Sequence, residues 1–137
     1  MERLIKRQQG VTLLEILLVL AIAAIIVTMS IRYYRSAATA QQASMMVTAA
    51  QAVTAEMESF AAGRATYTCV PAAILSKLTP LVVSCTAATA TSYTATIQSV
   101  NNDACLRAMQ QLGSGTKYIT MTCNGTGRLQ YTYNNAL

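Results

Sequence analysis

A single carboxylate inside an apolar run is the group in this chain best placed to do chemistry. The run extends from Val11 to Ile31, and Glu15 is its only formally charged residue. A helix of about 20 apolar residues spans the ~30 Å hydrocarbon core of a bilayer. A charge inside such a span costs roughly 2.5–3.5 kcal/mol near the helix centre. Glu15 is therefore predicted to meet a positive charge in its functional state.

Four cysteines are the second reactive set: Cys69, Cys85, Cys105 and Cys123. Their spacings match no zinc pattern, and the chain contains no histidine. The even number favours two disulfides formed in an oxidising compartment over free thiols. Four cysteines allow three pairings, and spacing alone does not choose among them. We expect no bound metal and no cofactor.

The segment before the apolar run is short, polar and basic, with Arg3, Lys6 and Arg7 ahead of Gly10. An ordinary signal peptide combines such a start with a shorter apolar core and a small-x-small cleavage site. Ala38-Thr39-Ala40 offers that site, but the apolar run is too long. A plain membrane anchor explains the length of the run. It explains neither Glu15 nor the switch to apolar residues directly after Gly10.

The order Gly10, one apolar residue, Thr12-Leu13-Leu14-Glu15 and an uncharged apolar stretch resembles the processing site of type IV prepilins. The resemblance implies cleavage after Gly10 by a prepilin peptidase and N-methylation of the new amine at Val11. It also implies that Glu15 meets the Val11 amine of a neighbouring subunit during assembly. Val11 replaces the Phe usual in type IVa major pilins and is closer to the type IVb group, although the leader is shorter than many type IVb leaders.

A single long helix is predicted over 11–62, because this range holds neither Pro nor Gly and is rich in Ala. Residues 11–31 form its transmembrane or filament-core half. Beyond them, apolar residues recur at helical spacing and form one stripe: Met46, Ala49, Val53, Met57 and Phe60. Gly63 is a suitable C-terminal stop. The second half of the helix is therefore expected to pack on a globular head.

Residues 63–137 are predicted to form that head, after a leader over 1–10 and the long helix. Short helices are expected over 71–80 and from Asn101 to Gly113, and strands over 81–85, 92–100, 118–123 and 128–133, with a Thr/Ala loop over 86–92. The predicted fold class is α+β. The long helix packs by its C-terminal half on a small antiparallel sheet, as in type IV pilins, and its apolar half protrudes.

Periodicity places Cys105 on the inward face of its helix. It places Cys123 with Ile119 and Met121 on the inward face of its strand. Type IV pilins have a disulfide-bounded loop near the C-terminus, so the resemblance implies a Cys105–Cys123 bridge. Cys69–Cys85 is then the remaining pair.

The resemblance implies a structural subunit of a type IV pilus rather than an enzyme. The head contains no histidine, and Asp103 is its only carboxylate, which gives no catalytic arrangement. The implied partners are further copies of the chain, a prepilin peptidase, and the assembly ATPase and platform. The implied location is the bacterial inner membrane, with a periplasmic head, followed by the extracellular pilus.

Three alternatives remain within the family: a minor pilin, a pseudopilin of type II secretion, and a DNA-binding minor pilin for uptake. The third is compatible with five basic residues in the head against Asp103: Arg64, Lys77, Arg107, Lys117 and Arg128. Phosphate tracking normally shows denser Lys and Arg, so nucleic acid is not the favoured partner. The sequence does not choose among adhesion, motility, conjugation and DNA uptake.

Overall fold

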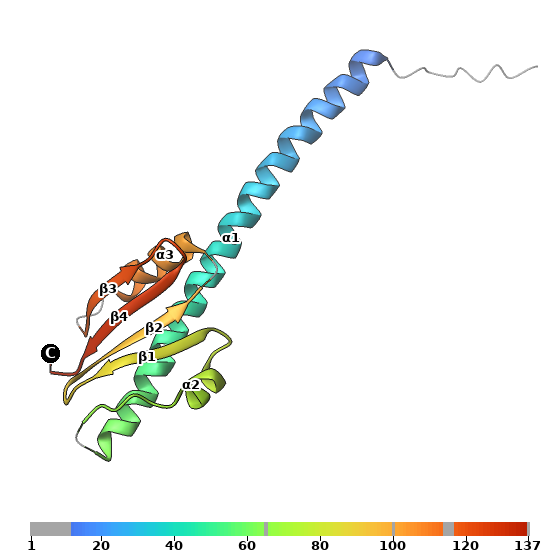
Figure 1. The fold of residues 1–137 in the computed structure, drawn as a ribbon. Helices are drawn as coiled ribbons and strands as arrows, with labels where there is room; N and C mark the ends of the chain where they lie inside the picture. The colour runs from blue at the N-terminus through green and yellow to red at the C-terminus, as the bar shows by residue number, and fades with distance from the viewer. Residues whose placement is uncertain (1–11, 65, 100, 114–116, 137) are drawn as a thin grey trace, which may run out of the picture. The chain divides into compact units, whose positions relative to one another are not determined.

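The computed structural model describes residues 12–64, 66–99, 101–113 and 117–136. The elements, in chain order (Figure 1), are α1 (Leu13–Ala62), α2 (Ala72–Leu78), β1 (Val82–Ala88), β2 (Ser92–Gln98), α3 (Asn102–Leu112), β3 (Tyr118–Cys123) and β4 (Arg128–Asn134). The predicted α+β class, with a long N-terminal helix packed on an antiparallel sheet, is confirmed. The chain divides between Ser36 and Ala37 into an N-terminal unit and a head unit, and each is described by itself.

The sheet of the head unit has the strand order β1-β2-β4-β3, and every pairing is antiparallel. The last strand, β4, therefore lies between β2 and β3. Its register places Tyr133 opposite Tyr93 and Leu129 opposite Ile97. Strict alternation along both strands buries these side chains on one face of the sheet.

The core lies between that face and two helices. The second part of α1 contributes Met46, Val53 and Met57, which are all buried, as the helical stripe predicts. Helix α3 adds Ala104, Cys105, Ala108 and Leu112. Its start is capped by Asn101, whose side chain accepts a hydrogen bond from the Asp103 backbone N–H at 3.0 Å. Helix, helix and sheet therefore share one contiguous core.

Thr54 joins α1 to the sheet through hydrogen bonds inside this core. The Tyr93 hydroxyl donates to Thr54 Oγ1 at 2.8 Å, and the Tyr118 hydroxyl lies 3.1 Å from the same oxygen. Thr54 in turn donates to the backbone carbonyl of Ala50 at 2.8 Å. A buried hydroxyl that satisfies two phenols fixes the rotation of α1 against the sheet, because slippage would leave all three groups unpaired.

Two disulfides reinforce the head. Cys69–Cys85 ties the segment before α2 to β1, and Cys105–Cys123 ties α3 to β3. Cys105–Cys123 is the pair that the prepilin resemblance implied, and Cys69–Cys85 is the remaining pair. Each closes a short loop, a type of crosslink that typically adds about 2–4 kcal/mol to the stability of a small domain.

Two strands differ from the prediction, β1 in its length and β3 in the face that Ile119 occupies. In β1 the pairing shifts between Cys85 and Ala87, and the strand continues to Ala88, so the predicted loop over 86–92 begins too early. In β3 the pairing shifts between Tyr118 and Thr120. The shift leaves Ile119 exposed, and the prediction that Ile119 faces inward is wrong. β1 runs on because Ala87 and Ala88 still pair with Thr94 and Tyr93 of β2 beyond the shift. In β3 the shift leaves Ile119 as the extra residue of a β-bulge, which breaks the alternation at that point.

The turn between β3 and β4 yields the first testable prediction. Gly127 has a φ of 80°, and a Cβ there would lie 3.0 Å from the Ser99 carbonyl oxygen and 3.0 Å from the Asn101 carbonyl carbon. Gly127→Ala is therefore expected to destabilise the head by about 2 kcal/mol or more, since left-handed backbone alone costs an L-residue roughly 1–2 kcal/mol. Thermal unfolding of the full chain in detergent micelles, followed by circular dichroism, measures the loss.

Gly125→Ala is the matched control in the same turn, because a Cβ at Gly125 meets nothing within 4 Å. Its melting temperature should stay close to that of the wild type. Equal melting temperatures for the two variants would contradict the tight approach of this turn to the segment around Asn101.

The buried tyrosines yield a second prediction, on pH. Burial is the largest cause that raises the pKa of the Tyr93 and Tyr131 phenols above their ordinary value of 10.0. Below pH 10 both folded and unfolded chains keep these protons. Above pH 10 the unfolded chain ionises first, so the stability of the head falls, by up to about 1.4 kcal/mol per pH unit for each tyrosine.

Tyr93→Phe should make the free energy of unfolding fall less steeply above pH 10 than in the wild type. The control is Tyr34→Phe, which removes a phenol from the exposed surface of α1 and leaves the core intact. Urea unfolding at a series of alkaline pH values measures the slope. The burial argument fails if Tyr93→Phe and the wild type give the same slope.

Candidate processing and assembly segment

The N-terminus of helix α1 is capped by Thr12. The Thr12 carbonyl accepts from the backbone N–H groups of Glu15 at 3.0 Å and Ile16 at 3.2 Å, and Thr12 Oγ1 accepts from Glu15 N–H at 3.3 Å. Thr12 is therefore the N-cap, and Glu15 is the third helical residue. A capping box has two hydrogen bonds, and the one present here runs from the backbone N–H of the third helical residue to the side chain of the N-cap. The helix starts at Leu13, two residues later than the predicted 11–62 range.

The capping role of Thr12 was missed from the sequence. Its signal is present, since a Thr stands three residues before a Glu at the start of an apolar run. The cap matters for Glu15, because it fixes that residue in the first turn of α1. The exposed N–H groups of a first turn carry partial positive charge and stabilise a nearby carboxylate by about 0.3–1 kcal/mol.

The surface of α1 beyond Glu15 is apolar and exposed. Large aliphatic side chains are solvent-exposed on every turn of the helix, from Leu13, which is 78% exposed, to Ile31, which is 48% exposed. By length and composition, α1 is able to cross a membrane, and it is the one such helix among the described residues. Within the N-terminal unit no described element covers this surface. The helix therefore needs lipid or other chains around it.

Hydroxyl groups within this surface are satisfied by the helix itself. Thr28 Oγ1 donates to the Ile25 carbonyl at 2.9 Å, and Ser30 Oγ donates to the Ile26 carbonyl at 2.8 Å. Neither side chain then needs water or a neighbour. The segment thus offers lipid or a packed helix bundle few polar groups besides Glu15.

The apolar surface ends at the sequence Arg32-Tyr33-Tyr34-Arg35. Tyr33 and Tyr34 are 80% and 74% exposed. Aromatic rings with a polar tip, flanked by Arg, are typical of the level at which a helix leaves the hydrocarbon of a membrane. The apolar run therefore has a carboxylate near its start and an interfacial band at its end.

The structure describes only part of the predicted site. Glu15 lies in the first turn of α1, whereas Gly10 and Val11 lie outside the described residues. The predicted disulfide cysteines all lie in the head unit. Within the described part of the chain, no group of three or more Cys, Asp or Glu side chains is placed to hold a metal ion.

A family model of the prokaryotic N-terminal methylation motif matches residues 5–31. The chain carries the type IV prepilin signature. The match includes Gly10, Val11, Glu15 and the apolar part of α1, and it ends before the head unit. No curated protein and no solved structure matched the chain.

The prepilin signature supports a type IV pilin-like or pseudopilin protein, a family that is structural rather than catalytic. It implies processing by a prepilin peptidase and assembly by the pilus machinery. Together with the apolar surface of α1, it fits a chain that is first anchored in a membrane and later incorporated into a pilus.

The cap on α1 yields a third prediction. Thr12→Val keeps the size and branching of the side chain but removes the hydroxyl acceptor, and losing an N-cap costs about 1 kcal/mol of helix stability. Amide hydrogen exchange of Glu15 and Ile16 should therefore accelerate about fivefold in micelles, since 1.4 kcal/mol corresponds to a factor of ten. Thr28→Val is the matched control, because Thr28 bonds only within the helix interior. Unchanged exchange in Thr12→Val would contradict the capping role.

Proposed function

We propose that this chain is the structural subunit of a type IV pilus, of the type IVb-like major-pilin kind. It is cleaved after Gly10, methylated at Val11, and polymerised through the apolar part of α1. The observation that carries the proposal is the exposed apolar surface of Leu13–Ile31 with one carboxylate, Glu15, fixed in its first turn. The core of the head unit is built from residues that follow this surface.

Cleavage after Gly10 creates an amine at Val11, four residues before Glu15. Methylation of an amine keeps its positive charge. Surrounded by the apolar helices of a filament, that ammonium and the carboxylate of a neighbouring subunit attract strongly. Leaving either one buried and alone costs about 3–5 kcal/mol. The pair therefore selects one axial register between neighbours, and it contributes specificity more than net stability.

The same apolar surface contacts two different environments, one before assembly and one during it. Before assembly, lipid covers it and the subunit waits in the inner membrane, with its head in the periplasm. During assembly, the corresponding helices of other copies replace the lipid. The assembly platform and its ATPase provide the energy for this transfer. The two disulfides suit a head that ends outside the cell, where the compartment is oxidising.

Minor pilins and type II secretion pseudopilins carry the same signature, so abundance separates them from a major pilin. A major pilin dominates sheared surface filaments, whereas the other two are trace components. The described head disfavours a DNA-binding minor pilin. Its basic residues are spread over different elements, with Lys77 on α2, Arg107 on α3 and Arg128 on β4. Phosphate tracking normally uses a denser set of Lys and Arg than the head contains.

Glu15 yields the fourth prediction. Glu15→Ala leaves Gly10 and Val11 in place, so peptidase cleavage should proceed as in the wild type. Sheared filaments should fall at least tenfold, because an incoming ammonium finds no partner. Immunoblots of the membrane and sheared fractions measure both steps, since cleavage shortens the chain visibly.

Glu56→Ala is the matched control, because it removes a carboxylate from the part of α1 that lies in the head unit. It should leave filament yield unchanged. Normal filament yield from Glu15→Ala would contradict the proposed pairing.

A further inference from the structure

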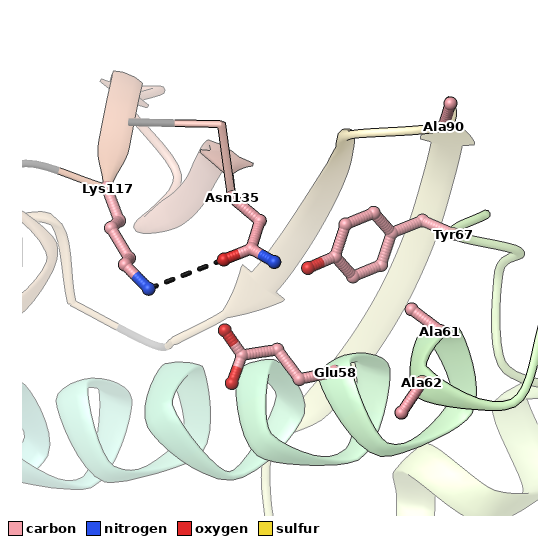
Figure 2. Close-up of a pocket in the computed structure, with 7 residues that line it drawn as sticks. All are labelled: Glu58, Ala61, Ala62, Tyr67, Ala90, Lys117 and Asn135. Carbon is pink, nitrogen blue, oxygen red and sulfur yellow. Dashed lines mark hydrogen bonds between the residues drawn. The ribbon is translucent and has the colours of Figure 1, made fainter. Parts of the chain in front are cut away.

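A hollow of about 500 Å³ opens in the head unit beside the C-terminal end of α1. Figure 2 shows the residues around it: Glu58, Ala61, Ala62, Tyr67, Ala90, Lys117 and Asn135. Three come from α1 and Tyr67 from the segment after it, whereas Ala90 lies between β1 and β2, Lys117 directly before β3 and Asn135 directly after β4. The prepilin signature does not reach these residues, and nothing in the proposed assembly uses them.

Opposite charges face each other across this hollow (Figure 2). Glu58 presents its carboxylate from α1, and one of its oxygens accepts a hydrogen bond from the Tyr133 hydroxyl. Lys117 extends from the other side, where its Nζ donates to Asn135 Oδ1 at 3.4 Å and lies 5.9 Å from the centroid of the Tyr133 ring. Among the described residues, the carboxylate and the ammonium form no ion pair with each other.

Tyr67 supplies a second, independent observation. Its side chain is 5% exposed, and its hydroxyl is buried with no hydrogen-bond partner. In Figure 2 this hydroxyl points between Glu58 and Asn135. A buried hydroxyl without a partner costs about 1–3 kcal/mol, so a phenylalanine would suit the folded head better. An unpaired donor aimed at a hollow between two charges is the arrangement of a ligand site.

We propose that this hollow binds a small zwitterion of the α-amino-acid type. The ligand carboxylate accepts from Lys117 Nζ, from the Asn135 amide nitrogen and from the Tyr67 hydroxyl. The ligand ammonium donates to the second oxygen of Glu58. The methyl groups of Ala61, Ala62 and Ala90 leave room for a side chain and give it an apolar wall.

The charge pattern favours a zwitterion over singly charged ligands. A simple carboxylate satisfies the three donors but lies against the Glu58 charge, and a simple amine satisfies Glu58 but lies against Lys117. Only a ligand with both charges close together matches both walls, and the interactions are charge-assisted on each side. This site is independent of filament assembly, so pilus yield is not its test.

The test measures ligand binding to the full chain in detergent micelles at constant ionic strength. Thermal unfolding and titration calorimetry are run with L-alanine, L-leucine, acetate and methylammonium. At least one of the two amino acids should raise the melting temperature in a concentration-dependent way, as mass action requires. Acetate and methylammonium should bind at least tenfold more weakly. No response to either amino acid, or an equal response to acetate, would overturn the proposal.

Three variants separate a ligand site from a structural contact. Tyr67→Phe removes only the unpaired hydroxyl, so the melting temperature without ligand should stay the same or rise while affinity falls at least fivefold. Glu58→Gln keeps an acceptor for Tyr133 but removes the charge, and affinity should fall at least tenfold. Glu56→Gln removes the same charge from a residue outside the hollow and should leave affinity unchanged.

A merely structural role predicts a different set of results. In that case Tyr67→Phe lowers the melting temperature without ligand and leaves the amino-acid affinity at the wild-type value. Equal losses of affinity in Glu58→Gln and Glu56→Gln would likewise overturn the proposal, because they would trace to net charge rather than to the hollow.

Discussion

A carboxylate in apolar surroundings must be paired with a positive charge, and the first part of this chain is arranged around that constraint. Glu15 stands alone in an apolar stretch, and Thr12 fixes it in the first turn of α1. In lipid, the first-turn N–H groups provide partial compensation. In the proposed filament, the ammonium of a neighbouring subunit pairs with this carboxylate. Under the proposed function, Glu15 therefore selects one axial register between neighbouring subunits.

The same helix also belongs to the core of the head, and its two parts obey different packing rules. The first part presents large aliphatic side chains outward, whereas the second part buries Met46, Val53 and Met57 under the sheet. Thr54 then locks the second part to two phenols of the sheet. Both parts belong to one helix, and Leu13–Ala62 contains neither Pro nor Gly, the residues that would kink or break it.

Much of this organisation follows from periodicity that the sequence displays. Helical spacing predicted the buried stripe of α1 correctly, and the residue pattern predicted strands where β2 and β4 form, each with strict alternation of buried side chains. Prediction failed where a bulge shifts the register, since bulges at Cys85–Ala87 and Tyr118–Thr120 carry no marker in residue type. The hollow beside α1 was not predictable either. Glu58, Tyr67 and Lys117 meet there only because the chain folds back on itself.

The mass of the subunit in sheared surface filaments tests the central claim most directly. Intact-mass spectrometry of that fraction, with and without reduction, reports the N-terminus, the methyl group and the disulfides together. The account predicts an abundant chain that begins at Val11, carries one added methyl group on its amine, and gains four hydrogens on reduction. A filament chain that still begins at Met1, or a Val11 chain found only in the membrane fraction, would contradict it.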